Sequence, residues 1–202
     1  MRAALIDTHC HFDFPPFASH EAESLRLARE AGVEKIIVPA IAAVYFPRVL
    51  ALTRDYPPLY AALGLHPIVI HQHDDAALSI LETALASAPE KCVAIGEIGL
   101  DLYMENPDFP RQEYILEGQL ALARHYGLPV ILHSRRTHDK LAWHLKRAAL
   151  SRTGVIHGFA GSLQQALRFV DLGYSIGVGG TITWPRASKT RDVMARLPLA
   201  SL

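Results

Sequence analysis

The sequence predicts an α/β fold in which a parallel sheet, covered by helices, closes into a barrel. Three observations predict this fold: short apolar runs alternate with helical segments, glycines stand where helices end, and metal-binding side chains follow several of the runs. Half of the 202 residues are apolar, which is enough to form one sizeable core. We therefore expect residues 1–202 to form a single domain.

Seven short apolar or β-branched runs are the candidate strands of this sheet. Their hydrophobicity is continuous rather than alternating, which is typical of strands buried on both faces of a parallel sheet. An open, doubly wound sheet fits this pattern equally well, so the strands alone do not establish a barrel. The runs span 5–6, 36–38, 60–65, 93–98, 130–132, 155–156 and 174–178.

Helical segments separate the runs. Gly32, Gly127 and Gly173 each stand between a helical segment and the next apolar run, where glycine accepts the left-handed conformation that ends a helix. Segment 111–126 carries apolar residues at the three-to-four spacing that gives a helix one buried face. Strands that alternate with such helices predict βαβ units. The apolar residues of that segment are Ile115, Leu116, Leu120, Ala123 and Tyr126.

Composition and charge argue against several classes of protein. Lysine plus arginine and aspartate plus glutamate both total 20, so no bulk positive field attracts a polyanion and any nucleic-acid contact must be local. The chain reaches Asp7 before an apolar stretch as long as a signal peptide or membrane span can form. We expect a cytoplasmic protein with no membrane partner, in which Cys10 and Cys92 are both reduced.

His9 and His11 follow the first apolar run. Side chains alternate faces along a strand, so the two imidazoles point the same way while Cys10 points the other way. Two imidazoles on one face can bind one metal ion. The pair alone is a weak signal, but its position after an apolar run is where ligand-binding residues lie in parallel sheets and barrels.

Three further candidate ligands follow other runs in the same way. Glu97 follows 93–96, His133 follows 130–132, and His157 follows 155–156. A charged Glu97 within an apolar strand requires a partner that offsets its desolvation, and a cation is one such partner. The ends of these strands meet if the sheet closes, whereas an open sheet need not bring them together. We therefore favour the barrel.

Five blocks of the sequence resemble the TatD family of metal-dependent deoxyribonucleases. The resemblance implies a TIM-type (β/α)8 barrel that hydrolyses phosphodiester bonds by means of a metal-activated water, with single-stranded DNA as the expected substrate. It also implies two divalent metal ions, for which magnesium, manganese and zinc are the candidates. The blocks are Ile6-Asp7-Thr8-His9-Cys10-His11-Phe12-Asp13, Gly64-Leu65-His66-Pro67, Gly96-Glu97-Ile98-Gly99-Leu100-Asp101, His133-Ser134-Arg135 and His157-Gly158-Phe159-Ala160-Gly161-Ser162.

The resemblance also implies a role for each candidate ligand. His9 and His11 would bind one metal ion, His133 and His157 would bind the second, and Glu97 would bridge both. Four imidazoles and a carboxylate favour zinc or manganese over magnesium on ligand softness, whereas deoxyribonuclease activity in the family is associated with magnesium. The identity of the metal therefore stays open.

The sequence departs from the family pattern at its end. A full eight-stranded barrel takes about 250 residues, and family members carry a Glu-Thr-Asp block on the eighth strand. This sequence ends at Ala200-Ser201-Leu202, so we expect seven strands, without the eighth strand and its aspartate. Within the family that aspartate would bind metal and accept a proton from the attacking water.

Four other residues are candidates for the site. His66 follows the third run and is a candidate contact for phosphate or the leaving group. Arg135, two residues after His133, is a candidate phosphate ligand because a guanidinium can donate two hydrogen bonds to one phosphate. Asp7 and Asp101 are candidates for orienting a metal-binding histidine, or are simply hydrogen-bonded aspartates.

The remaining histidines lie outside the strand-end pattern. His71 and His73 imitate the spacing of His9 and His11 but do not follow an apolar run. We expect all six of these histidines to be exposed on helices or loops. They are His20, His71, His73, His125, His138 and His144.

Two alternative functions remain open. A barrel with a His-x-His pair also supports an amidohydrolase that acts on a cyclic amide, ester or lactone. Glu97 argues against this alternative, because many such enzymes carry a carboxylated lysine at the matching strand end. The second alternative, suggested by the expected lack of an eighth strand, is a metal-binding protein without catalytic activity.

Overall fold

The computed structural model describes residues 4–87 and 89–202, whose strands form one seven-stranded sheet. Every strand pairs in parallel with the next strand along the chain. All seven expected runs correspond to strands. Residues 1–3, which belong to the segment considered for a signal peptide, lie outside the described residues. The strands are β1 (Leu5–Asp7), β2 (Val33–Pro39), β3 (Leu59–Leu63), β4 (Cys92–Asp101), β5 (Val130–Arg135), β6 (Gly154–Ile156) and β7 (Ser175–Ile176).

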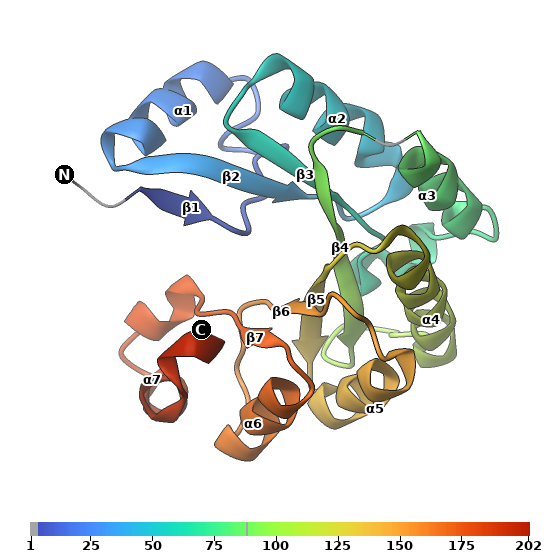
Figure 1. The fold of residues 1–202 in the computed structure, drawn as a ribbon, viewed down its shortest axis with the longest axis vertical. Coiled ribbons are helices and arrows are strands. Elements are labelled where there is room, and N and C mark those ends of the chain that lie inside the picture. The colour runs from blue at the N-terminus through green and yellow to red at the C-terminus, as the bar shows by residue number, and fades with distance from the viewer. Residues whose placement is uncertain (1–3, 88) are drawn as a thin grey trace.

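Helices connect the strands, and α1 to α6 cover the outer face of the sheet (Figure 1). Among the described residues, no helix is long and apolar enough to cross a membrane. The α-helices are α1 (Glu21–Glu30), α2 (Phe46–Asp55), α3 (Ala77–Ala86), α4 (Phe109–Tyr126), α5 (His138–Ala148), α6 (Leu163–Asp171) and α7 (Ser188–Arg196). Short 3-10 helices are η1 (Ala43–Tyr45), η2 (Pro67–Gln72), η3 (Gly180–Thr183) and η4 (Leu199–Ser201).

Local sequence signals explain where the helices begin and end. The Asp108 side chain accepts a hydrogen bond from the Arg111 N–H at the start of α4, and α4 ends at Gly127 with a φ of 62°. Ser162 begins α6 and forms a reciprocal capping box with Gln165. These helix ends determine the length of each connection between strands. The amino ends of the strands therefore lie at one edge of the sheet and their carboxyl ends at the other.

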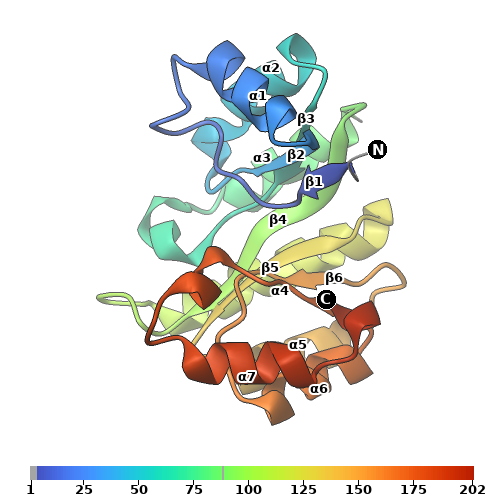
Figure 2. The same cartoon turned by 90° about the vertical axis from the view of Figure 1, so that its left-hand side faces the viewer.

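The sheet curls into a half-barrel. Within the described residues β1 and β7 are the edge strands, and no backbone pairing joins them. Figure 2 shows the half-barrel from its open side, with β1 above the opening and α7 below it. Leu5 and Ile6 on β1 are 52% and 56% exposed there. The predicted α/β class and barrel-type curl are confirmed, with seven parallel strands described.

The main core fills the space between the sheet and its helices. Leu63, Ile98 and Leu132 on adjacent strands are fully buried in it, as is Phe169 of α6. Close packing of this kind resists small displacements. The carboxyl ends of β3, β4 and β5 therefore stand on a rigid base.

The expectation that six histidines are exposed is wrong for three of them, because His73, His138 and His144 are buried. Two of these form hydrogen bonds. His73 Nε2 lies 2.9 Å from the His66 carbonyl oxygen, across η2, and His144 Nε2 lies 2.8 Å from Glu113 Oε1 on another helix. Glu113 is distant from His144 in the sequence, so no local pattern indicated that contact. The exposed histidines are His20, His71 and His125.

Candidate metal centre

Glu97 lies in the second half of β4, and its side chain is only 3% exposed. The pairing of β4 with β5 shifts register between Ile95 and Ile98, so the segment that carries Glu97 departs from the regular ladder. The Glu97 N–H donates to the Ala40 carbonyl oxygen across the sheet, at 3.1 Å. Glu97 is thus a buried carboxylate on an irregular part of a central strand.

Two glycines make room for this segment. A Cβ atom on Gly64 would lie 2.5 Å from the Gly96 carbonyl carbon and 2.9 Å from the Glu97 nitrogen. A Cβ atom on Gly96 would lie 2.6 Å from the Ile131 Cβ. All three distances are shorter than ordinary van der Waals contacts, so a side chain at either glycine would displace the backbone that carries Glu97.

Four imidazoles surround the Glu97 carboxylate, and each of its oxygens faces two of them. Oε2 lies 3.0 Å from His9 Nε2 and 3.4 Å from His11 Nε2, both on the segment after β1. Oε1 lies 3.2 Å from His66 Nε2, after β3, and 3.3 Å from His133 Nδ1, on β5. The curl of the sheet therefore brings the ends of β1, β3 and β5 around one residue of β4.

These imidazoles determine the charge of the site. Burial by itself raises the pKa of a carboxyl group, but hydrogen bonds from the four imidazoles hold the pKa of Glu97 well below its usual value. The carboxylate is consequently ionised. A buried carboxylate that is surrounded by imidazole nitrogens strongly attracts a cation.

The side chains present fit divalent cations. Within the part of the chain that the structure describes, two groups of ligand atoms lie within 4.8 Å of one another: His9, His11 and Glu97, and His66, Glu97 and His133. Imidazole nitrogens with a carboxylate oxygen are the ligands that zinc, manganese and similar ions accept. The His9 Nδ1 atom is also buried without a hydrogen-bond partner in the structure. The expected ligands His9, His11, Glu97 and His133 therefore lie together.

The position of His157 differs from that of the other four expected ligands. It follows β6, and its ring stacks on that of His9, with centroids 3.3 Å apart and planes 7° apart. Its nitrogens belong to neither group of clustered ligand atoms among the described residues. Burial, and after it the neighbouring His9, lowers the pKa of His157 to about 4, so its imidazole is neutral. A neutral imidazole is the form that binds metal.

Asp101, the last residue of β4, orients His133. Its Oδ2 lies 2.8 Å from His133 Nε2, and its Oδ1 accepts a hydrogen bond from the Tyr103 N–H at 2.7 Å. His133 Nδ1 is thereby directed toward Glu97. Burial by itself lowers the pKa of His133, but hydrogen bonds with Asp101 and Glu97 raise it to about 9 in the absence of metal. Histidine ligands of metal ions commonly form such a hydrogen bond with a carboxylate through their second ring nitrogen.

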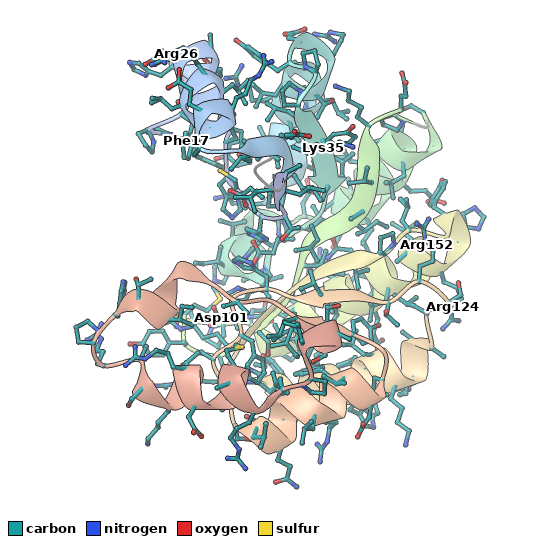
Figure 3. All side chains as sticks on the ribbon, turned by 60° about the vertical axis from the view of Figure 1, so that its left-hand side comes forward. Phe17, Arg26, Lys35, Asp101, Arg124 and Arg152 are labelled. Atoms are coloured by element: carbon teal, nitrogen blue, oxygen red, sulfur yellow. The ribbon has the colours of Figure 1, made fainter. Side chains whose placement is uncertain are left out.

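The site lies at the carboxyl ends of the strands. Figure 3 shows Asp101 on the side of the barrel opposite Arg124 and Arg152. Arg152 lies two residues before β6, and Arg124 lies near the end of α4, which leads into β5. Parallel α/β barrels bind ligands at the carboxyl ends of their strands, so the position agrees with a functional role.

Arg135 ends β5 beside the site and is exposed. Its guanidinium carbon lies 3.7 Å from the centre of the Tyr103 ring, and that of Arg136 lies 4.5 Å from the same ring. The sequence singled out Arg135 but not Tyr103 or Arg136. Tyr103 follows β4 in a loop, so only the pairing of β4 with β5 brings it beside the two arginines.

Two aspartates near the first histidine pair differ in their surroundings. Asp7 is exposed and accepts a hydrogen bond from the His9 N–H at 3.1 Å, so it supports the backbone of the pair. Asp13 is 9% exposed, and neither of its carboxylate oxygens has a hydrogen-bond partner among the described residues. Burial raises the pKa of Asp13. The sequence offered no separate signal for Asp13, because it lies in a loop after His11.

The chain is similar to known metal-dependent hydrolases. The TatD related DNase family matches residues 6–202. The uncharacterized metal-dependent hydrolase YjjV of Escherichia coli K12 is 66% identical over 202 residues, which cover 100% of this chain and 78% of that protein. The 3′-5′ ssDNA/RNA exonuclease TatD of Pantoea ananatis is 31% identical over 208 residues, which cover 98% of this chain and 76% of that protein.

Solved structures share the fold. The crystal structure of the TatD homolog YjjV from Escherichia coli K12 superposes with a TM-score of 0.96 at 67% identity and covers 98% of this chain and 76% of that one. A TatD family hydrolase from Entamoeba histolytica has a TM-score of 0.90 at 22% identity, over 100% of this chain and 73% of that one, which shows the fold alone. From the family match and the sequence identities, the chain belongs to the TatD family of metal-dependent hydrolases.

Proposed function

We propose that the chain is a nuclease that uses two divalent cations to hydrolyse phosphodiester bonds in single-stranded nucleic acid, with DNA as the preferred substrate. The observation that carries this proposal is the division of the Glu97 carboxylate between two pairs of imidazoles. One buried carboxylate can therefore bind two neighbouring cations. The relative from Pantoea ananatis, a 3′-5′ ssDNA/RNA exonuclease, supports the substrate class.

The proposed ligands follow from the same arrangement. His9 and His11 would hold one cation together with Glu97, and His133 would hold the second with Glu97. His157, stacked on His9, and His66, 3.2 Å from Glu97, are the two candidates for completing the second site. Two bound cations supply an activated water at neutral pH and stabilise the charge that develops on the phosphate.

Glu97, His66 and Arg135 are the residues that we propose to act in catalysis. The Arg135 guanidinium is exposed beside the site, where it can bind a phosphate through two hydrogen bonds. His66 Nδ1 accepts a hydrogen bond from the Ile68 N–H at 2.9 Å, so its Nε2 faces the site. That nitrogen can contact the phosphate or the leaving group. We also propose that residues 1–202 act as one domain, because the candidate ligands lie on or directly after strands of a single sheet.

Hydrolysis of a defined oligonucleotide tests the reaction. The protein, loaded in turn with magnesium, manganese or zinc, should release nucleotides from a single-stranded DNA oligonucleotide, and EDTA should abolish the release. RNA and duplex DNA of the same sequence are the comparison substrates. Hydrolysis of a cyclic amide or lactone, with oligonucleotides and bis(p-nitrophenyl) phosphate untouched, would establish the amidohydrolase alternative. Metal binding without hydrolysis of any of these would establish a non-catalytic metal-binding protein.

Metal content tests the ligands. His9→Ala and Glu97→Ala should lower the metal-to-protein ratio measured by elemental analysis, whereas His71→Ala, at an exposed position of η2, should not. His66→Ala and His157→Ala, measured side by side, decide which of them completes the second site, since only the ligand's variant loses metal. Retention of metal by His9→Ala together with its loss from His71→Ala would overturn the assignment.

A further inference from the structure

We propose that Tyr103, Arg135 and Arg136 form a nucleotide-binding subsite beside the metal centre, in which the Tyr103 ring stacks on a base and the two guanidiniums bind backbone phosphates of a single strand. This inference rests on the proposed function and deepens it. It identifies residues that would favour an extended single strand over a small phosphodiester.

The side-chain geometry suits such a strand. The guanidinium carbons of Arg135 and Arg136 lie 3.7 Å and 4.5 Å from the centre of the Tyr103 ring. Tyr103 is nevertheless 52% exposed, so much of its side chain can still be reached. A guanidinium stacked on a ring keeps the N–H donors at its edge available for acceptors. Aromatic rings combined with cations are the usual means by which proteins bind single-stranded nucleic acid.

The two arginines form no ion pair in the described residues, although the positive charge of Arg135 is among the interactions that lower the pKa of Asp101 against the effect of burial. Within residues 4–87 and 89–202, no ion pair includes Arg135 or Arg136, and neither side chain donates a hydrogen bond. Other arginines are neutralised, as Arg111 is by Asp75 at 3.1 Å and Arg168 by Asp139 at 2.8 Å. An unpaired guanidinium is available for a charge-assisted hydrogen bond to phosphate.

Hydrogen bonds attach this subsite to the metal centre. The Asp101 carboxylate accepts the Tyr103 N–H at 2.7 Å through one oxygen and lies 2.8 Å from His133 Nε2 through the other. The Leu102 N–H donates to the Arg135 carbonyl oxygen at 3.0 Å. The ends of β4 and β5 therefore hold the ring and the guanidiniums close to the candidate ligands. A strand that stacks on Tyr103 can extend to the metal centre.

A second aromatic residue with two cations provides a matched control. Trp143 on α5 is 47% exposed, and Lys140 and Arg147 lie 5.0 Å and 4.4 Å from its ring. It has the same combination of aromatic ring and cations as Tyr103. It lies on a helix of the outer layer, however, and none of the hydrogen bonds described above links it to the metal centre (Figure 1).

Binding without turnover tests the stacking. The anisotropy of a fluorescein-labelled oligothymidylate, measured in EDTA, should report an affinity roughly 5- to 150-fold lower for Tyr103→Leu, the range expected for one stacked base. Tyr103→Phe should bind like the parent because it keeps the ring, and Trp143→Leu should also bind like the parent. Unchanged affinity in Tyr103→Leu, or an equal loss in Trp143→Leu, would overturn the subsite.

Salt dependence tests the two arginines. Each phosphate contact that is lost should reduce the slope of log association constant against log salt by about 0.7 for a single strand. Arg135→Gln and Arg136→Gln should each show this reduction, whereas Arg147→Gln beside Trp143 should not. An unchanged slope in both of the first two variants would contradict a role in phosphate binding.

Kinetics separate a failure of this inference from a failure of the proposed function. Tyr103→Leu should raise KM for the oligonucleotide more than it lowers kcat, and Tyr103→Phe should restore KM. If the parent cleaves the oligonucleotide and Tyr103→Leu has the same KM, the subsite is wrong and the nuclease proposal stands. If the parent neither binds the oligonucleotide nor hydrolyses any phosphodiester, both are wrong.

Discussion

His133 and His144 are two largely buried imidazoles, each between two carboxylates, in different layers of the molecule. His133 lies on β5, with Nδ1 3.3 Å from Glu97 and Nε2 2.8 Å from Asp101. Glu97 is itself only 3% exposed and faces three further imidazoles. In this region, imidazole nitrogens from the ends of several strands lie close to one carboxylate.

His144 lies on α5, and its two carboxylates come from α4. Its Nε2 lies 2.8 Å from Glu113 and its Nδ1 3.2 Å from Glu117. Glu117 is 54% exposed, and Lys140 also pairs with Glu113 at 2.8 Å. Solvent and a lysine therefore stabilise these carboxylates, whereas Glu97 depends on imidazoles. A histidine with two carboxylates therefore forms a candidate metal centre only where further imidazoles surround a buried carboxylate.

Replacing one carboxylate in each region should produce the largest difference. Glu97→Gln removes the shared anion, so we expect metal content to fall and kcat/KM for an oligonucleotide to drop by more than about 100-fold, the upper end of the effect of an outer-shell partner. Glu113→Gln should keep both, and should lower the free energy of unfolding by less than about 1 kcal/mol, as for a partly exposed ion pair. Equal losses of metal in the two variants would remove the distinction between the regions.

The second carboxylate of each histidine sharpens the comparison. Asp101→Asn should weaken metal binding or activity by about 10- to 100-fold, because the amide orients the His133 ring less well. Glu117→Gln, at the corresponding position beside His144, should change neither. Metal titration of the two purified variants measures the difference. An Asp101→Asn protein with the affinity of the parent would show that Asp101 does not position His133.

The close packing of the backbone behind Glu97 is a further difference between the two regions. Gly64→Ala would place a Cβ 2.5 Å from the Gly96 backbone behind Glu97, so we expect a loss of about 1–3 kcal/mol in the free energy of unfolding, as in other overpacked sites, together with weaker metal binding. Gly180→Ala is the control, since nothing lies within 4 Å of its added Cβ. Urea unfolding and metal titration measure the two effects. Tight metal binding by Gly64→Ala would show that the segment can shift without disturbing the carboxylate.

A third buried histidine should produce the smallest effect. His138 forms no ion pair within the described residues, and burial lowers its pKa below 6.5. The unfolded chain then binds a proton that the folded chain does not, so this residue contributes a loss of stability as the pH falls through 6.5.

His138→Gln should therefore reduce the pH dependence of the free energy of unfolding on the acid side, by at most the roughly 1.4 kcal/mol per pH unit that one proton contributes. His125→Gln, at an exposed position of α4, should leave this dependence unchanged. Urea unfolding between neutral and mildly acidic pH measures both slopes. The same slope in His138→Gln and the parent would mean that His138 is protonated in the folded state as readily as in the unfolded one.

The order of strands and helices, and the strand ends that carry the candidate ligands, could be predicted from the sequence. These features depend on short stretches of chain. Continuous apolar runs form buried parallel strands, glycines such as Gly127 end helices, and a polar residue after an apolar run falls at the carboxyl edge of the sheet. For this reason His9, Glu97 and His133 could be selected from the sequence, and the structure brings them together.

Which of these side chains contact one another depends on how the elements pack. His66 lies at Glu97, His157 stacks on His9, and Asp101 connects His133 to Tyr103, although each pair is distant in the sequence or separated by a turn. Strand register, the curl of the sheet and the close approach of Gly64 to Gly96 determine these contacts. The burial of His144 between two helices has the same origin. Desolvation and side-chain contact arise from packing between elements, which the order of residues along one element does not specify.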